Sequence, residues 1–111
     1  MSSKIRILTT RKFDSSTKKL SKKYNSLIED LILLKHVIIK NPQSGIPLGN
    51  NCYKLRMKIT SKQQGKSGGA RVITYVLIKE STITLLDIYD KSEKDSITQK
   101  ELQVLIKKAV Q

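Results

Sequence analysis

Basic side chains alternate with apolar ones in the segment Tyr53–Ile59, whose sequence is YKLRMKI. Successive side chains of a β-strand point to opposite faces, so a strand here would carry Lys54, Arg56 and Lys58 on one face and apolar residues on the other. Guanidinium and ammonium groups in a row are suited to binding phosphate oxygens. The pattern therefore predicts a surface for a polyanion, and it favours RNA.

A second basic segment follows this strand. Gly68 and Gly69, which we expect to turn the chain with positive φ, precede Arg71 and another apolar run. Lys62 and Lys66 lie in the polar tip between the two runs. The two runs and their tip predict a β-hairpin with a cationic face, and the two tip lysines are expected to contact RNA phosphates.

The composition agrees with an anionic partner. The chain has 111 residues, 38% of them hydrophobic, which suits one domain spanning residues 1–111. It carries 22 Lys and Arg against 9 Asp and Glu, a net charge of +13, with no acidic residue between Asp30 and Glu80. This charge favours nucleic acid, the ribosome, an anionic membrane or an acidic protein as partner, and a generically basic soluble protein is the alternative.

The sequence has few residues of the types that a Cys–His nucleophile or a metal site requires. Cys52 is the single cysteine, so no intrachain disulfide is possible, and His36, the single histidine, lies in an apolar helical run. We therefore expect neither a Cys–His nucleophile nor a metal site. The N-terminus lacks the apolar stretch of a secretory signal, and Leu27–Ile39 is too short and too charged to span a bilayer. A cytoplasmic protein without membrane contact is expected.

Hydrophobic spacing predicts the elements that position these residues. Lys4–Thr9 is expected to form a short strand, and Asp14 and Ser15 to cap the helical region that follows. An apolar residue then recurs every three or four positions, which predicts one amphipathic helix or two successive helices. The members of this stripe are Leu20, Tyr24, Leu27, Leu31, Leu34 and Ile38.

The second half of the chain is predicted to be mostly strand. Asn41–Asn51 contains both prolines and is expected to be a loop. Thr98 and Glu101 have the spacing of a capping box that would begin a final helix. The predicted strands, of which the last two should pair antiparallel through the tight connection 79–81, are Tyr53–Ile59, Arg71–Ile78 and Thr82–Tyr89. The expected order is β-α(α)-βββ-α.

Five segments resemble a known family. They are NP-x-x-G (41–45), KLR (54–56), GKSGGARVI-x-Y (65–75), LL-x-IYDKSE (85–93) and IT-x-x-EL (97–102). Together, over residues 4–108, they resemble the RelE/ParE toxin superfamily, and within it the HigB-type branch of type II toxin–antitoxin systems. The resemblance implies a RelE-like α+β fold, in which a small antiparallel sheet packs on N-terminal helices.

The resemblance also implies an activity. Many members of the family are ribosome-dependent endoribonucleases that cut mRNA without a metal or other cofactor, inhibit translation and are neutralised by a cognate antitoxin. The implied partners are therefore the antitoxin, the ribosome and mRNA. The residues that correspond to the family's catalytic positions, together with their basic neighbours, are Lys54, Arg56, Lys58, Arg71, Tyr89, Lys91 and Lys94. Of these, Lys94 is assigned to RNA or ribosome binding, like Lys62 and Lys66.

Metal-free RNA cleavage uses the 2′-hydroxyl as nucleophile on the adjacent phosphorus. We expect Arg71, assisted by Arg56, to stabilise the charge that gathers on the phosphoryl oxygens. A base must also remove the hydroxyl proton, and neighbouring cations would lower the pKa of a lysine or tyrosine toward neutrality. The base is left open among Lys54, Lys58, Lys91 and Tyr89.

Two other functions remain as alternatives. A ParE-like toxin of similar fold would inhibit DNA gyrase by protein contact alone, without catalysis. A catalytically inactive basic protein could bind RNA or the ribosome. The cationic strand face and Arg71 favour the nuclease, because a gyrase inhibitor has no need of clustered phosphate ligands. The few scattered aromatic residues argue against a base-stacking platform for free single strands.

Overall fold

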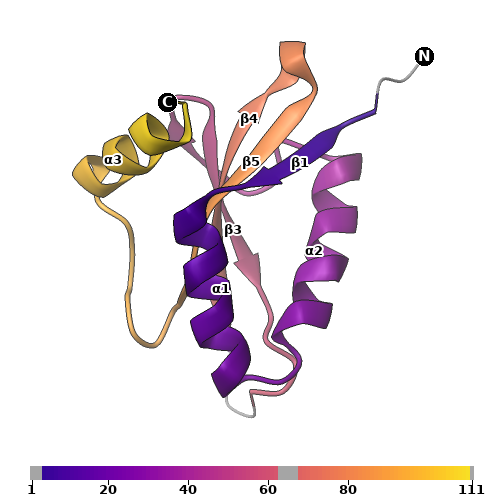
Figure 1. Cartoon of the computed structure of the whole chain (residues 1–111), viewed down its shortest axis with the longest axis vertical. Coiled ribbons are helices and arrows are strands. Elements are labelled where there is room, and N and C mark those ends of the chain that lie inside the picture. Colours follow the sequence, from indigo (N-terminus) through magenta and orange to yellow (C-terminus); the bar gives the residue numbers. More distant parts are fainter. Residues whose placement is uncertain (1–3, 63–67, 111) are drawn as a thin grey trace.

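The computed structural model describes residues 4–62 and 68–110. In this part of the chain, five strands form one sheet in the order β1-β5-β4-β3-β2, and three helices pack against it (Figure 1). The strands are β1 (Arg6–Thr9), β2 (Ile46–Gly49), β3 (Cys52–Met57), β4 (Ala70–Leu77) and β5 (Thr82–Asp90). The helices are α1 (Arg11–Lys23), α2 (Leu27–Lys40) and α3 (Gln99–Ala109), with a 3-10 turn η1 (Ile78–Glu80) between β4 and β5.

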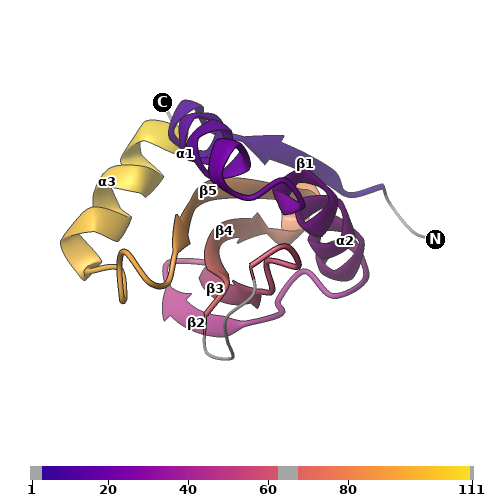
Figure 2. The same ribbon diagram turned by 90° about the horizontal axis from the view of Figure 1, so that it is seen from below.

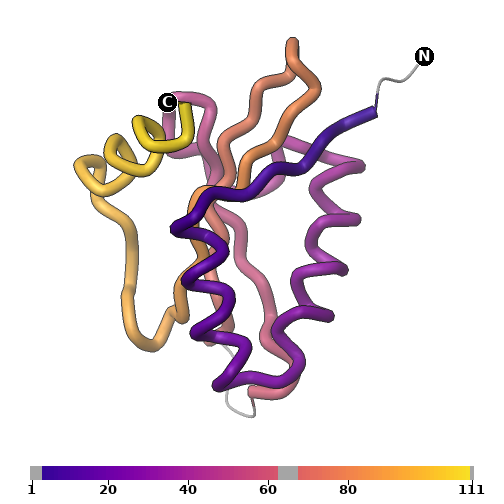
Figure 3. The backbone as a smooth tube through the Cα atoms, viewed as in Figure 1, coloured from indigo at the N-terminus to yellow at the C-terminus, as the bar shows by residue number. Residues whose placement is uncertain are grey.

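The predicted α+β class is confirmed, and the sheet is mixed. Strand β1 pairs in parallel with β5, with Arg6 opposite Thr82, whereas the other neighbouring strands pair antiparallel. The sheet is therefore not wholly antiparallel, because the first strand of the chain joins its edge beside the last one. In the order of the chain, α1 and α2 come after β1 and before the other strands of the sheet (Figure 3).

The N-terminal helical region forms two helices. The cap of α1 is Thr10 and not Asp14 or Ser15, because the Thr10 hydroxyl accepts a hydrogen bond from the Phe13 amide at 3.0 Å and donates one to the Leu86 carbonyl at 3.1 Å. The Thr10 cap thus joins the start of α1 to β5. Helix α1 ends at Tyr24, whose backbone is extended.

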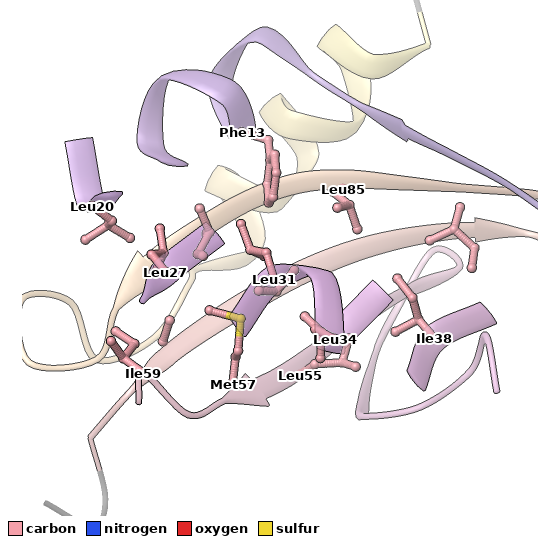
Figure 4. Packing of buried hydrophobic residues seen from close by; sticks show 14 of the residues in the cluster. Phe13, Leu20, Leu27, Leu31, Leu34, Ile38, Leu55, Met57, Ile59 and Leu85 are labelled. Carbon is pink, nitrogen blue, oxygen red and sulfur yellow. The ribbon is translucent and has the colours of Figure 1, made fainter. Parts of the chain in front are cut away.

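The apolar stripe packs onto the sheet as predicted (Figure 4). Five of its six members are buried, and Tyr24 is partly buried. They meet the apolar face of β3, where Leu55 and Met57 are buried, and the buried Ile59 two residues beyond the strand. The alternation in this strand is therefore confirmed, and its cationic residues lie on the other face. A second cluster around Leu102 packs α3 on the sheet, so that α2 and α3 lie on opposite sides (Figure 2).

The expectation that Asn41–Asn51 is a loop is wrong in part. Residues Ile46–Gly49 form β2, the edge strand beside β3. Pro47 is tolerated there because an edge strand can leave one side of its backbone without sheet partners. Asn50 and Asn51 have φ of 54° and 64°, the left-handed conformation that a two-residue hairpin turn requires.

The C-terminal elements agree with their sequence signals. Strands β4 and β5 pair antiparallel, and Thr98 and Glu101 form the predicted capping box at the start of α3. Between β5 and α3 the chain makes a long excursion before it returns beside the sheet (Figure 3). No helix among residues 4–62 and 68–110 combines the length and the apolar character needed to cross a membrane.

Candidate RNA-cleavage site

A cleft of about 310 Å³ opens beside the cationic face of β3. It gathers residues from β2, β3, β4 and the segment after β5, and four of the seven are cationic. The lining residues are Ile46, Lys54, Arg56, Arg71, Lys91, Asp95 and Ser96. Four of the six side chains predicted to be catalytic therefore line one cleft, and the unpredicted strand β2 supplies one of its walls.

Arg71 is the most deeply placed of these cations, with an exposed fraction of 6%. Its Nη1 atom donates hydrogen bonds to the Ala70 carbonyl at 3.1 Å and to the Gly68 carbonyl at 3.4 Å, which fix the orientation of the guanidinium. Within the described residues, no carboxylate lies within 4.0 Å of this group. A buried arginine with only carbonyl partners keeps its charge available for an anion.

The neighbours of Arg71 on the adjacent strands are Arg56 and Tyr89. Like charges directly opposite each other on paired strands destabilise a sheet. The Arg56–Arg71 pair therefore opposes folding, and it becomes favourable when an anion bridges the two guanidinium groups. This arrangement is typical of a binding site and not of a structural ion pair.

The cleft also holds one carboxylate that the sequence did not reveal as a site residue. Asp95 forms an ion pair with Lys91 and is itself largely exposed. The hydrogen bond from Lys91, followed by the charges of Lys91, Lys54 and Arg71, holds the pKa of Asp95 below its ordinary value. Asp95 therefore stays ionised and competes with a phosphate for Lys91. The four-residue spacing of Lys91 and Asp95 was the only sequence signal for this contact.

Tyr89 does not line the cleft, although it pairs with Arg71 across β4 and β5. Its exposed fraction is 7%, and its hydroxyl oxygen is buried without a hydrogen-bond partner among the described groups. Burial raises the pKa of Tyr89, and the opposing charge of Arg71 is the weaker effect. The charge of Arg71 does lower this pKa as expected, but desolvation of the phenolate dominates, so the expected net shift toward neutrality is wrong for Tyr89. Lys94 lies over the Tyr89 ring, 5.5 Å from its centroid.

The remaining predicted cations lie elsewhere. Lys58 is exposed beyond the end of β3 and does not line the cleft. Lys62 Nζ lies 3.1 Å from an oxygen of Asp90, so its charge is already paired inside the protein. Lys66 lies outside the described residues. Lys94 is paired with Glu101 at 2.7 Å.

Asp90, the last residue of β5, joins the end of this strand to the segments around it. Its carboxylate is 1% exposed and accepts hydrogen bonds from the Tyr24 hydroxyl at 2.7 Å, from Lys62 at 3.1 Å and from the amide and hydroxyl of Ser92. Burial by itself would raise the pKa of Asp90, but the hydrogen bonds from Tyr24, Ser92 and Lys62 outweigh it and lower the pKa. This network fixes the backbone from which Lys91 enters the cleft.

Gly69 lies two residues before Arg71, where the backbone passes close to Met57 at the end of β3. Its φ is +81°, and a Cβ atom there would lie 2.5 Å from the Met57 carbonyl oxygen. The Gly69 carbonyl also accepts a hydrogen bond from the Lys91 amide at 3.0 Å. The positive φ predicted for the glycine pair is thus observed at Gly69, while Gly68 is not among the residues with positive φ.

Cys52 and His36, the single cysteine and the single histidine, do not line the cleft. Cys52 is buried, and desolvation raises its pKa to about 11, so that the thiol stays protonated at neutral pH. His36 is exposed on α2. In the described part of the chain, no group of three or more His, Cys, Asp or Glu side chains is placed to hold a metal ion.

Comparison with known proteins identifies the fold and the family of the chain. The chain is similar in structure to a double arginine-to-alanine mutant of the E. coli toxin RelE in the free state, with a TM-score of 0.56 and 11% sequence identity over 97% of this chain and 96% of that one. At this identity the likeness shows a shared fold. A family model described as the RelE toxin of the RelE/RelB toxin–antitoxin system matches residues 5–111. The chain therefore belongs to the RelE family of toxins of toxin–antitoxin systems.

Proposed function

We propose that this toxin is a ribosome-dependent mRNA endoribonuclease of the HigB-like type, inhibited by a cognate antitoxin. Its family membership supports a toxin with an antitoxin partner. The observation that carries the nuclease proposal is the buried Arg71 without a carboxylate partner among the described residues, in a cleft shared with Lys54, Arg56 and Lys91. A protein that acted by protein contact alone would have no use for this arrangement.

The cleft residues suit the charge changes of the reaction. As the 2′-oxygen bonds to phosphorus and the bond to the 5′-oxygen breaks, negative charge gathers on the phosphoryl oxygens. Arg71, held by the Ala70 and Gly68 carbonyls, can donate to these oxygens without reorganising, and Arg56 lies on the neighbouring strand. The products are a 2′,3′-cyclic phosphate on one fragment and a 5′-hydroxyl on the other.

Proton transfer is assigned to the lysines of the cleft. Tyr89 is a poor base because its pKa is raised, and its hydroxyl is buried away from the cleft surface. Its proposed role is to pack beside Arg71. Lys54 and Lys91 line the cleft and are the candidates for removing the 2′-proton and protonating the 5′-oxygen. Lys58 and Lys62 are left out of this proposal, because Lys58 lies outside the cleft and Lys62 is held by Asp90.

The ribosome would compensate for the weak base. A substrate held with its 2′-oxygen in line with the scissile bond can gain roughly 7–11 kcal/mol of the barrier from orientation alone. The cleft is open and lined by only seven residues, so it provides little means to bend a free RNA into this geometry. We therefore expect cleavage to require mRNA that is already positioned on the ribosome.

The test is cell-free translation with purified protein, followed by primer extension on the mRNA. The same mRNA without ribosomes is the matched control. Cuts that occur only with ribosomes support the proposal. Intact mRNA and normal translation would contradict it, and a gyrase supercoiling assay would then examine the ParE-like alternative. Equal cleavage of naked RNA would reject the dependence on the ribosome.

A further inference from the structure

Strand β2 contributes an apolar side chain, Ile46, to the wall of the RNA-cleavage cleft. Among the described residues that line the cleft, Ile46 is the only apolar one, and it is 60% exposed. The other lining residues are four cations, Asp95 and Ser96. Single apolar side chains are common on protein surfaces, so exposure alone has no functional meaning. Ile46 differs from these because a ligand that fills the charged cleft must lie against it.

The backbone around Ile46 fixes its place beside Lys54. Gly45, the preceding residue, has φ +100°, and a Cβ atom there would lie 2.5 Å from the Lys54 carbonyl oxygen. The chain therefore enters β2 at a close approach to β3. Ile46 is then directly opposite Lys54 in the antiparallel pair. Directly opposite residues have their side chains on the same face of a sheet, so Ile46 and Lys54 are neighbours on one wall of the cleft.

The size of the cleft suits one nucleotide of a bound strand. Its volume of about 310 Å³ is at the low end of the range of roughly 300–1,000 Å³ for small-molecule sites. A phosphate on Arg71 and Arg56 occupies the cationic part, and the ribose and base attached to it must lie along a wall. Every base has a flat face that packs against an apolar side chain. Ile46 offers such a contact.

The strand register indicates which base this is. The attacking 2′-oxygen belongs to the nucleotide on the 5′ side of the scissile phosphate, and Lys54 is a candidate for removing its proton. A ribose placed beside Lys54 brings its own base to Ile46, the neighbour of Lys54 across the two strands. The base on the 3′ side is attached beyond the phosphate, so it has no corresponding contact with Ile46.

We propose that Ile46 binds the base of the nucleotide 5′ to the scissile phosphate and thereby orients the 2′-hydroxyl of that nucleotide. The identity of the substrate rests on the proposed nuclease function, whereas the apolar wall beside phosphate-binding cations is a property of the cleft itself. A face contact requires a base but does not read its edge. Purines cover more of Ile46 than pyrimidines, so a preference for a purine at this position is expected.

The experiment measures the binding of dinucleotides to the full-length protein by NMR titration of its backbone amides. The ligands are 2′-deoxy dinucleoside monophosphates, which have one phosphate and lack the nucleophile, so they are not cleaved. One ligand carries adenine on both sugars, one lacks the 5′ base and one lacks the 3′ base. Inorganic phosphate is the reference without any base.

The variants are Ile46→Ala, the conservative Ile46→Leu and the control Ile78→Ala. Ile78 is a matched isoleucine, because it is 58% exposed in η1 and does not line the cleft. Circular dichroism confirms that each variant is folded.

Removing the 5′ base should weaken binding to the wild type by about five- to tenfold, because most of an exposed isoleucine side chain is then left uncovered. The same removal should weaken binding to Ile46→Ala by less than about twofold, since the partner of the base is already absent. Removing the 3′ base should affect the wild type and Ile46→Ala equally. Ile46→Leu should bind the intact dinucleotide within about twofold of the wild type, and Ile78→Ala should match the wild type.

Three results would overturn the proposal. The first is an equal loss in the wild type and Ile46→Ala when the 5′ base is removed. The second is a dependence of the Ile46→Ala effect on the 3′ base instead. The third is a wild-type protein that binds the intact dinucleotide no more tightly than inorganic phosphate.

Cleavage on ribosomes separates this inference from the nuclease proposal. If the wild type cuts mRNA, Ile46→Ala should lose the preference for a purine 5′ to the cut, and an unchanged preference would overturn the role of Ile46 while the nuclease function stands. If the wild type does not cut, the nuclease proposal fails. The dinucleotide titration still decides in that case whether Ile46 binds a base.

Discussion

Replacing Asp90 by Asn should destabilise the fold, because this carboxylate joins three separate parts of the chain. It accepts hydrogen bonds from Tyr24 at the end of α1, from Lys62 after β3 and from Ser92 after β5, and it is 1% exposed. An Asn side chain keeps the shape but not the charge. Lys62, whose side chain is 17% exposed, would then lose its paired carboxylate.

The expected loss follows from the burial of this pair. Removing one partner of a buried ion pair costs about 3–5 kcal/mol, since the other charge is left uncompensated. In a domain of about 100 residues each kcal/mol corresponds to roughly 4 °C or more in Tm, so Asp90→Asn should lower Tm by roughly 10–20 °C near pH 7. Thermal unfolding followed by circular dichroism measures this shift.

The pH dependence gives a sharper test. The pKa of Asp90 is lower in the folded state than its ordinary value, so its contribution to stability is fully present above about pH 4 and is lost as the pH falls through the folded-state pKa. The Tm difference between wild type and Asp90→Asn should therefore be largest near pH 7 and shrink below about pH 4. A difference under about 3 °C at pH 7, or one that is constant down to about pH 2, would refute this account of the network.

Three further outcomes are expected. Asp95→Asn removes the anion that competes for Lys91 and should tighten binding of a single-stranded RNA by about two- to fivefold in a filter-binding titration, and weaker binding would contradict the competition. Gly69→Ala should lower the free energy of unfolding in urea by roughly 1–3 kcal/mol more than Gly49→Ala, since both have positive φ but only Gly69 faces a backbone oxygen. Iodoacetamide should alkylate Cys52 slowly at about pH 8 in the folded protein and rapidly in urea, because burial raises its pKa, and equal rates would refute this.

The elements that could be predicted from the sequence are those whose periodicity reports burial directly. The alternation in Tyr53–Ile59 and the stripe from Leu20 to Ile38 each bury one face, so both patterns correspond to packing in the structure. The capping box at Thr98 is local chemistry within four residues. Arg71, which lines the cleft, was a candidate because of its place after the Gly68–Gly69 pair and because of the resemblance to a known family.

The features that could not be predicted depend on contacts between distant residues. Strand β2 is four residues long, contains Pro47 and is mostly exposed, so it has no alternation to recognise. The pairing of Lys62 with Asp90 joins residues 28 positions apart. The raised pKa of Tyr89 depends on how α3 and the sheet bury its ring, which no local pattern reports.

The proposed function is tested most directly by single-turnover cleavage of mRNA on programmed ribosomes by the wild type and Arg71→Ala. Lys79→Ala, which removes one exposed cation from the turn at the far end of β4 and β5, is the matched control (Figure 1). Loss of a preorganised donor to the transition state predicts a rate lower by about 10²–10³ for Arg71→Ala and an unchanged rate for Lys79→Ala. Full cleavage by folded Arg71→Ala, or equal losses in both variants, would contradict the assignment of the cleft as the catalytic site.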